Sequence, residues 1–117
     1  MTNITRLHAD KRLSETVVHN NTVYLAGQVA DKTCRENAYA QTKEVLGLID
    51  HLLHEVNSDK SKILNAQIFL ADMADYAEMN RAWDEWVDQP NPPSRATVEA
   101  KLADPCWKVE IVITAAL

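Results

Sequence analysis

The order in which the spacing of apolar residues changes along the chain constrains the fold most. Segments in which every second residue is apolar, as in a β-strand, enclose two segments with the spacing of an amphipathic helix. The expected elements are a β-hairpin over 16–26, a helix over 33–56, a strand over 63–71, a helix over 72–87 and strands over 94–102 and 107–115. This ββ-α-β-α-ββ order predicts an α+β fold.

Three local signals mark the expected ends of these elements. Asn20 and Asn21 stand between the first two strands, and asparagine tolerates the positive φ that a tight hairpin turn needs. Thr33 and Glu36 have the spacing of a capping box, so the first helix is expected to begin there. Asp72 is the expected N-cap of the second helix, because its carboxylate can accept a hydrogen bond from a free backbone N–H of the first turn.

Two helices can cover only one face of such a sheet, so the composition of the other face is informative. The alternation assigns to the covered face Leu64, Ala66, Ile68, Leu70, Ala96, Val98, Val109, Ile111 and Ile113. It assigns to the open face Asn65, Gln67, Phe69, Arg95, Thr97, Glu99, Glu110 and Val112. Such a face is too apolar to lie in water and too polar to form a dry core. It is typical of a subunit interface that encloses a wet, polar site, and we therefore expect a homo-oligomer.

Length and composition limit the classes of protein. A chain of 117 residues with 46% hydrophobic residues fits one folded domain over residues 1–117. The net charge of −5 opposes general binding of nucleic acids or of anionic membranes. No apolar run is long enough to span a membrane, and the polar start Met1–Arg6 lacks the apolar core of a signal peptide, so a cytoplasmic location is expected. With only Gly27 and Gly47, no glycine-rich phosphate loop can be written.

Arg95 and Glu110 are the strongest candidates for chemistry. Arg95 follows the proline-rich loop 89–93 and opens a strand, where its planar guanidinium can bind a carboxylate. Glu110 projects from the last strand, where a carboxylate needs a partner or can orient a water molecule. The alternative for both residues is a structural ion pair. The sequence leaves open the register of the last two strands, and with it the distance between Arg95 and Glu110.

Histidine and cysteine residues offer weaker candidates. His51 and His54 share one helix face, but no third ligand accompanies them, so no metal site is expected. Cys34 and Cys106 are far apart in the sequence and are expected to be unrelated thiols, because disulfides are rare in a reducing compartment. A reactive thiol at Cys106 has no supporting Cys/His motif. We expect a protein without a metal or another cofactor.

Several short segments resemble a known family when they are taken together. They are Tyr24–Gln28, Met79–Trp83, Pro93–Ala100 and Lys108–Ile111, and they follow one another along nearly the whole chain. In this order they resemble the RidA/YjgF family of enamine/imine deaminases. Arg12–Glu15 and Ile68–Asp72 are most similar to the YoaB-like branch of that family.

The resemblance implies a fold, an assembly and a reaction. The fold is a chorismate-mutase-like α+β fold, and the assembly is a homotrimer whose sheets line its interior, with sites in the clefts between subunits. The implied enzyme is a 2-iminobutanoate/2-iminopropanoate deaminase. It hydrolyses 2-aminoacrylate-type enamines, through their imine tautomers, to 2-oxo acids and ammonia. The implied partners are thus a small imine or 2-oxo acid and further copies of the chain, without nucleic acid or membrane.

The resemblance also implies roles for five residues. Arg95 holds the substrate carboxylate, and Glu110 positions or activates the hydrolytic water. Thr97 stands where many relatives have cysteine, so its backbone contacts the imine nitrogen. Asn80 and Gly27 match positions near the family's cleft.

The sequence departs from the family pattern at two places. Lys11–Ser14, with Leu13, stands where many relatives carry Gly-Pro-Tyr, and Ala26 stands where they often have serine. These changes alter the cleft wall and leave the substrate preference and the pathway open. The alternative function is a non-catalytic regulatory trimer that binds a small carboxylate through Arg95, and a third is a protein-interaction role. Glu110 favours the enzyme, because binding alone needs the arginine but not a carboxylate that handles water.

Overall fold

The computed structural model describes residues 3–117, and Met1 and Thr2 of the polar start lie outside the described residues. The strands are β1 (Thr5–Ala9), β2 (Ser14–His19), β3 (Thr22–Leu25), β4 (Gln28–Val29), β5 (Ile63–Leu70), β6 (Ser94–Glu99) and β7 (Val109–Ala116). The helices are α1 (Ala38–Glu55) and α2 (Tyr76–Trp86), with the short 3₁₀ turns η1 (Lys60–Lys62) and η2 (Met73–Asp75).

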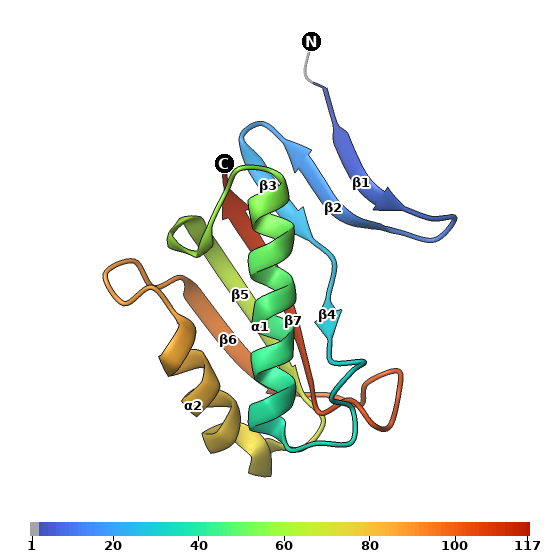
Figure 1. Cartoon of the computed structure of the whole chain (residues 1–117), viewed down its shortest axis with the longest axis vertical. Coiled ribbons are helices and arrows are strands. Elements are labelled where there is room, and N and C mark those ends of the chain that lie inside the picture. The colour runs from blue at the N-terminus through green and yellow to red at the C-terminus, as the bar shows by residue number, and fades with distance from the viewer. Residues whose placement is uncertain (1–2) are drawn as a thin grey trace.

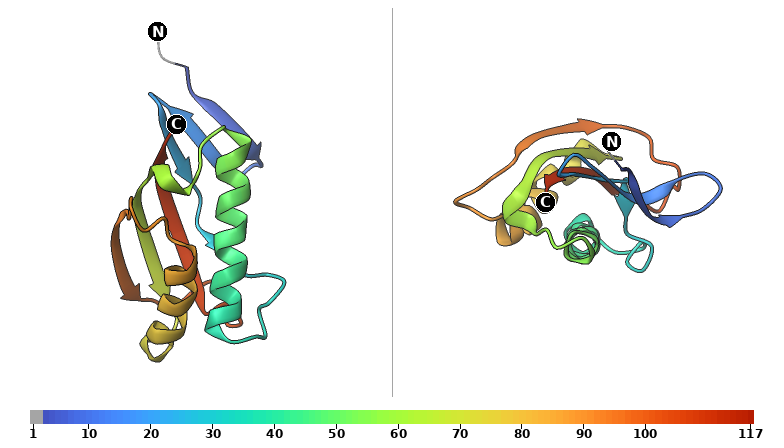
Figure 2. Two further views of the ribbon diagram at one scale, coloured as in Figure 1. Left: turned by 60° about the vertical axis from the view of Figure 1, so that its left-hand side comes forward. Right: turned by 90° about the horizontal axis from the view of Figure 1, so that it is seen from above.

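The strands form one mixed sheet in the order β1-β2-β3-β7-β5-β6, and β4 also pairs with β7. β5 and β6 run parallel because α2 connects them as a crossover, whereas the other pairs are antiparallel. Figure 1 shows α1 and α2 in front of the sheet, and Figure 2 shows from above that they lie on the same face. The expected α+β fold, with two helices on one face of a mixed sheet, is confirmed.

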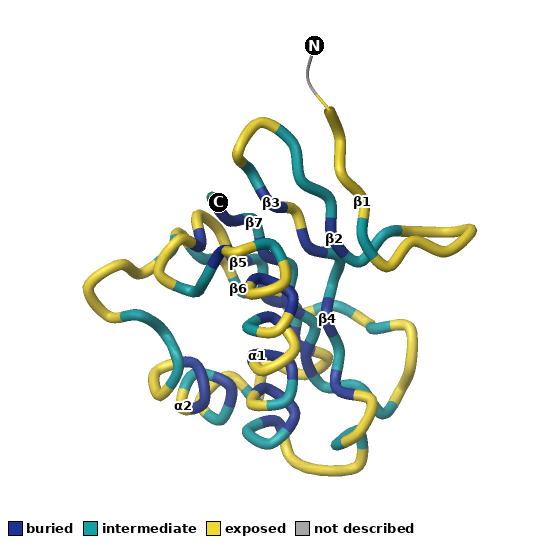
Figure 3. Tube along the Cα trace, turned by 45° about the horizontal axis from the view of Figure 1, so that its top comes forward, coloured by how far each residue is buried: buried dark blue, intermediate teal, exposed yellow. Residues whose placement is uncertain are grey.

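The hydrophobic core lies between the two helices and the covered face of the sheet. Figure 3 shows buried segments along α1 and the central strands, whereas β1 and most loops are exposed. Buried side chains of the core include Val45, Leu46, Ile49, Leu53, Ile68, Leu70, Met79, Trp83, Val109, Ile111 and Ile113. Burying each large apolar side chain contributes roughly 1.5–3 kcal/mol. Every second residue of β7, beginning with Val109, is buried, so the alternation expected for the last strand is confirmed.

The expected hairpin is confirmed in β2 and β3. Val17 lies opposite Tyr24, and the chain turns at Asn20 and Asn21, whose φ angles of 51° and 61° are those that a tight turn requires. The strands β1 and β4 were not expected. β1 pairs with β2 beyond the helix layer, where nearly all of its residues are exposed, so its sequence carries no alternation of polarity.

The first helix begins later than expected. Its N-cap is Asn37, whose side chain accepts a hydrogen bond from the backbone of the first turn at 2.9 Å. The prediction that Thr33 and Glu36 form a capping box is wrong, because the Thr33 hydroxyl donates a hydrogen bond to the Glu44 carboxylate at 2.7 Å instead. Glu44 lies inside α1 and also accepts hydrogen bonds from the backbone N–H groups of Lys32 and Thr33, so it anchors the preceding loop to the helix.

Two further boundaries differ from the expectation. Asp72 caps the 3₁₀ turn η2, and the regular helix starts after it at Tyr76. Leu64 was expected on the covered face and is 52% exposed, because a β-bulge lies between Ile63 and Asn65. Ile63 takes the buried position instead. No helix within residues 3–117 combines the length and the hydropathy that a membrane span requires.

The last two strands do not form a hairpin, because β5 lies between β6 and β7. β6 ends at Glu99, and residues 100–108 form a loop rather than the end of a strand. The pairing with β5 places three residues of β6 beside buried residues of the helix-covered face: Arg95 beside Ala66, Thr97 beside Ile68 and Glu99 beside Leu70.

The prediction that Arg95, Thr97 and Glu99 lie on the open face of the sheet is therefore wrong. These side chains lie on the covered face of the sheet, and Ala96 and Val98 lie on the open face, where Val98 is 43% exposed. The reason is that β6 is an edge strand. At the margin of the helix layer, polar side chains can lie beside a helix and still reach water. The polarity of a side chain in β6 therefore does not indicate which face of the sheet it occupies.

Candidate functional site

Arg95 is held against α2 by neutral groups. Its guanidinium donates to Asn80 Oδ1 at 2.8 Å and to the Tyr76 hydroxyl at 3.3 Å. The guanidinium carbon also lies 5.3 Å from the centroid of the Trp83 ring. Asn80, Tyr76 and Trp83 all project from α2, so the crossover that makes β5 and β6 parallel also positions the arginine.

The positive charge of Arg95 has no counter-charge in the part of the chain that the structure describes. The ion pairs found there join other residues. A structural ion pair within one chain therefore does not explain the arginine. Arg95 is half-buried and fixed in place, which leaves its charge free to bind an anion from outside the chain.

Glu110 lies on the central strand β7 and is packed against Gly27. A Cβ atom built at Gly27 would lie 2.1 Å from Glu110 Oε2, 2.9 Å from Cδ and 3.1 Å from Cγ. Any residue other than glycine would thus displace the carboxylate. Gly27 stands in the short break between β3 and β4, and β4 pairs beside Glu110 through Val29. This break brings the backbone of Gly27 under the glutamate side chain.

Arg95 and Glu110 do not share a cleft within one chain. Arg95 pairs with Ala66, whereas Glu110 pairs with Phe69, and successive residues of β5 point to opposite faces. Arg95 is therefore on the covered face and Glu110 is on the open face, with β5 between them. The candidate site consists of two halves: Arg95 with Asn80, and Glu110 with Gly27.

Thr97 belongs to the half that contains Arg95. It pairs with Ile68 on the covered face, and its buried hydroxyl oxygen has no hydrogen-bond partner within residues 3–117. β6 is the edge of the sheet, so one side of its backbone meets no other strand of the described chain. The backbone at Thr97 therefore lies at an edge that another chain or a ligand can approach.

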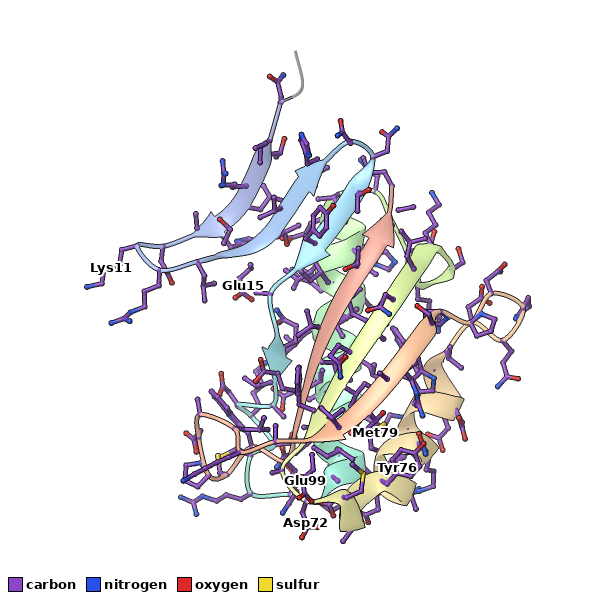
Figure 4. The ribbon with its side chains drawn as sticks, turned by 180° about the vertical axis from the view of Figure 1, so that it is seen from behind. Lys11, Glu15, Asp72, Tyr76, Met79 and Glu99 are labelled. Atoms are coloured by element: carbon purple, nitrogen blue, oxygen red, sulfur yellow. The ribbon has the colours of Figure 1, made fainter. Side chains whose placement is uncertain are left out.

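No element within residues 3–117 forms a layer over the open face of the sheet. Figure 4 looks onto this face, with the helices behind it; Glu15 lies near the connection from β3 to β4, and Glu99 lies at the end of β6. Apolar side chains occupy much of the face, which includes Tyr24 at 47% exposure and the half-buried Phe69 and Val112. An uncovered sheet face that carries several apolar side chains among polar ones is typical of an interface.

A pocket and two further sequence candidates lie apart from both halves. The pocket of about 730 Å³ at the 100–108 loop is lined by neither Arg95 nor Glu110. His51 is an exposed partner of Glu55 at 3.4 Å. The pKa of Cys106 is raised to about 12 by the neighbouring Cys34 thiol, by burial and by Asp104, which opposes a reactive thiolate there.

Tyr76 is a partner of Arg95 that was not expected from the sequence. Tyr76 is 42% exposed at the start of α2, and its hydroxyl accepts a hydrogen bond from Arg95. The available signal was its spacing, because Tyr76 and Asn80 are four residues apart and share one helix face. Together they form a polar edge beside the arginine.

Comparison with known proteins gives matches over almost the whole chain. A family model described as Endoribonuclease L-PSP matches residues 3–117. A RutC family protein of Haemophilus influenzae is 68% identical over 112 residues, which cover 96% of this chain and 97% of that protein. The RutC family protein YoaB of Escherichia coli is 46% identical over 114 residues, which cover 97% of this chain and 98% of that protein.

Structural and more distant matches agree with these relatives. The crystal structure of a YjgF family protein from Neisseria meningitidis has a TM-score of 0.94 and 47% identity, and covers 97% of this chain and 94% of that chain. A protein of Arabidopsis thaliana named Reactive Intermediate Deaminase A is 28% identical over 109 residues, which cover 89% of this chain and 58% of that protein. These matches and the chorismate-mutase-like α+β fold show that the chain belongs to the RidA/YjgF family, also named RutC, and to its YoaB-like branch.

Proposed function

We propose that this protein is an enamine/imine deaminase that hydrolyses 2-aminoacrylate-type intermediates to 2-oxo acids and ammonia. An enamine of this class tautomerises to an imine, water adds to the imine carbon, and the resulting carbinolamine expels ammonia. Family membership supports the proposal, as does the name of the Arabidopsis relative, Reactive Intermediate Deaminase A. The substrates are short-lived, so the enzyme has to be present in the compartment in which they form. We also propose that this compartment is the cytoplasm.

The observation that carries the proposal is the environment of Arg95. Asn80 and Tyr76 fix the guanidinium through neutral hydrogen bonds and leave its charge without a counter-ion in the described chain. A preorganised guanidinium binds a planar carboxylate with two charge-assisted hydrogen bonds. The carboxylate of a 2-imino acid is such a group, and its binding places the neighbouring imine carbon beside the arginine.

Glu110 is the proposed base for the water. Imine carbons are electrophilic already, so the reaction needs a positioned water and a proton acceptor more than it needs a strong activator. A half-buried carboxylate without an ion-pair partner in residues 3–117 can accept the water proton and return it to the leaving nitrogen. The packing of Gly27 against this carboxylate fixes its direction.

The two halves require a second chain to complete the site. We propose that the chain forms a homotrimer through its open sheet faces, and that Arg95 and the Thr97 backbone of one subunit meet Glu110 and Gly27 of the next. The uncovered face with Tyr24, Phe69 and Val112 supports this assembly. Light scattering at micromolar concentration is expected to give the mass of a trimer, and a stable folded monomer would contradict the shared site.

A coupled assay tests the activity directly. An amino-acid oxidase generates a 2-imino acid in solution, and semicarbazide traps the imine that has not yet hydrolysed. The protein is expected to lower the initial rate of semicarbazone formation, because the 2-oxo acid product reacts with semicarbazide more slowly than the imine does, while the yield of ammonia stays the same. Semicarbazone formation that does not change over a wide range of protein concentration would contradict the proposal.

The same assay separates the enzyme from a carboxylate-binding regulatory trimer. Both functions need Arg95, and both predict binding of a 2-oxo acid that calorimetry can measure. Only the enzyme accelerates the loss of imine, and only the enzyme depends on Glu110 for that acceleration. Binding without acceleration would assign the protein to the regulatory class.

A further inference from the structure

The two cysteines of the chain lie in loops that the fold brings together. Cys34 belongs to the loop 30–37 between β4 and α1, and Cys106 belongs to the loop 100–108 between β6 and β7. Figures 1 and 2 show these loops next to each other at the lower end of the molecule. Both cysteines are free in the structure, and their loops are neighbours in the fold although the two residues are far apart in the sequence.

A buried glutamine fixes the backbones of both cysteines. Gln41, fully buried on α1, places Nε2 within 3.0 Å of the carbonyl oxygen of Cys34 and within 3.0 Å of the carbonyl oxygen of Cys106. Its Oε1 accepts a hydrogen bond from the backbone N–H of Lys108 at 2.8 Å. One carboxamide group thus ties the two loops to each other and to the first helix.

Two more contacts hold the same loops. The indole N–H of Trp107, the residue after Cys106, donates to Asp31 at 3.0 Å. Glu44 accepts hydrogen bonds from the backbone N–H groups of Lys32 and Thr33, next to Cys34, at 3.1 and 2.8 Å. Both cysteines therefore sit on segments that are anchored beside them, and both side chains are half-exposed.

We propose that Cys34 and Cys106 are a redox-active dithiol that forms a reversible disulfide within one chain when a hydroperoxide oxidises the protein. This site is separate from Arg95 and Glu110 and does not depend on the proposed deaminase activity. A thiolate attacks the peroxide O–O bond to give a sulfenic acid and, with a proton, water or an alcohol. The second thiol then attacks the sulfenic sulfur, and water leaves. Two thiols are oxidised, one hydroperoxide is reduced, and a dithiol reductant reverses the change.

The sulfenic acid of the first step can be trapped in the single variants, where no resolving thiol remains. A 1,3-diketone is expected to trap it at Cys34 in Cys106→Ser or at Cys106 in Cys34→Ser, in whichever variant keeps the thiol that reacts with the peroxide. Absence of trapping in both variants, under conditions that oxidise the native pair, would contradict the proposal.

The consequence of oxidation is a covalent tie between the two loops. Residues 100–105 and Trp107 line the pocket of about 730 Å³, so the disulfide would fix one wall of that pocket. The bond would also close a long loop of chain, and we expect it to raise the Tm by roughly 5 °C or more. A lower Tm after oxidation would contradict the view that the folded loops are already in place for the bond.

The test is oxidation of the folded protein with hydrogen peroxide, followed by alkylation in denaturant and mass spectrometry. The reduced protein is expected to take up two alkyl groups. The oxidised protein should take up none and should lack the mass of two hydrogen atoms, and dithiothreitol should restore both thiols. Proteolysis should release a peptide pair that joins Cys34 to Cys106, and the protein should run as a single chain on a denaturing gel without reductant.

The matched controls are Cys34→Ser and Cys106→Ser, which each keep one thiol and cannot form the bond. Disulfides between chains in the native protein, seen as dimers on the gel, would overturn the proposal. A second result would also overturn the proposal: oxidation of each cysteine in the native protein to the sulfinic acid as fast as in the single variants. A resolving thiol would compete with that second oxidation and slow it.

Discussion

Arg95 and Glu110 lie on opposite faces of one sheet, with strand β5 between them. Arg95 is fixed beside α2, whereas Glu110 rests on Gly27 at the open face. A single chain therefore holds two separate halves, each with one unpaired charge in the described residues. The proposed reaction needs both halves at one substrate, and this requirement links the activity to the assembly.

Replacing Arg95 with alanine is expected to lower kcat/KM for imine hydrolysis by about 30- to 1,000-fold, or roughly 2–4 kcal/mol of transition-state stabilisation. The loss follows from the missing bidentate contact with the substrate carboxylate. Arg95→Lys is expected to recover only part of it, because an ammonium group lacks the planar fork. Steady-state kinetics with the coupled assay measures both effects.

The control for this variant is its assembly and Tm. If Arg95 instead forms an ion pair across a subunit interface, Arg95→Ala loosens the oligomer and lowers the Tm. A variant that stays assembled and thermally intact but hydrolyses imines at the parent rate would remove Arg95 from the site.

Glu110→Gln is expected to separate binding from turnover. The amide keeps the shape of the side chain but cannot accept the water proton, so kcat should fall by roughly 100-fold or more. Calorimetry should show binding of a 2-oxo acid within a few-fold of the parent protein. An unchanged kcat would show that another group handles the water.

Gly27→Ala is expected to reduce activity more than stability. The added Cβ displaces the Glu110 carboxylate, and the end of a glutamate side chain can swing away at low cost to the fold. Its kcat should therefore approach that of Glu110→Gln while the Tm changes little.

The matched control is Gly47→Ala on the exposed side of α1, where nothing lies within 4 Å of the new Cβ. This variant should keep full activity and gain about 0.5–1 kcal/mol in the free energy of unfolding, because alanine favours a helix more than glycine does. Equal losses of activity in the two variants would contradict the role given to Gly27.

Glu44 provides a pH dependence of stability. Burial opposes ionisation, but hydrogen bonds from the Thr33 hydroxyl and from the backbone of Lys32 and Thr33 outweigh it, so the pKa of Glu44 lies below its ordinary value of 4.5. A lowered pKa in the folded state stabilises the protein above pH 4.5, and this contribution is lost as the pH falls through the folded-state pKa.

The comparison with Glu44→Gln measures this contribution. The native protein should be more stable than the variant at neutral pH, and urea unfolding should show the difference shrinking as the pH falls below 4.5. A difference that does not depend on pH would mean that the charge of Glu44 does not stabilise the loop.

The elements that bury a full apolar stripe could be predicted from the sequence. β7 and α1 were found because their alternate or helical positions are buried in the core, and Asn20 and Asn21 marked the turn through their tolerance of positive φ. The face of β6 could not be predicted. An edge strand puts Arg95 beside the Trp83 ring and leaves Val98 exposed, which reverses the usual link between polarity and burial.

Contacts between distant segments were also outside the reach of local patterns. Thr33 and Glu36 fit a capping box, but the Thr33 hydroxyl donates its hydrogen bond to Glu44, which lies further along the chain inside α1. Similarly, Gln41 ties the loops of Cys34 and Cys106 together, and its position on the apolar face of the helix gave no sign of its three carbonyl partners.

The central claim is that each site combines Arg95 of one subunit with Glu110 of another, and mixed trimers test it most directly. Arg95→Ala and Glu110→Gln chains with different tags are co-expressed, and trimers that carry both tags are isolated. Each mixed trimer then contains one native site of three, so imine hydrolysis should recover to about one third of the native rate although both parent variants are nearly inactive. Mixed trimers that form but stay as inactive as their parents would contradict the shared site.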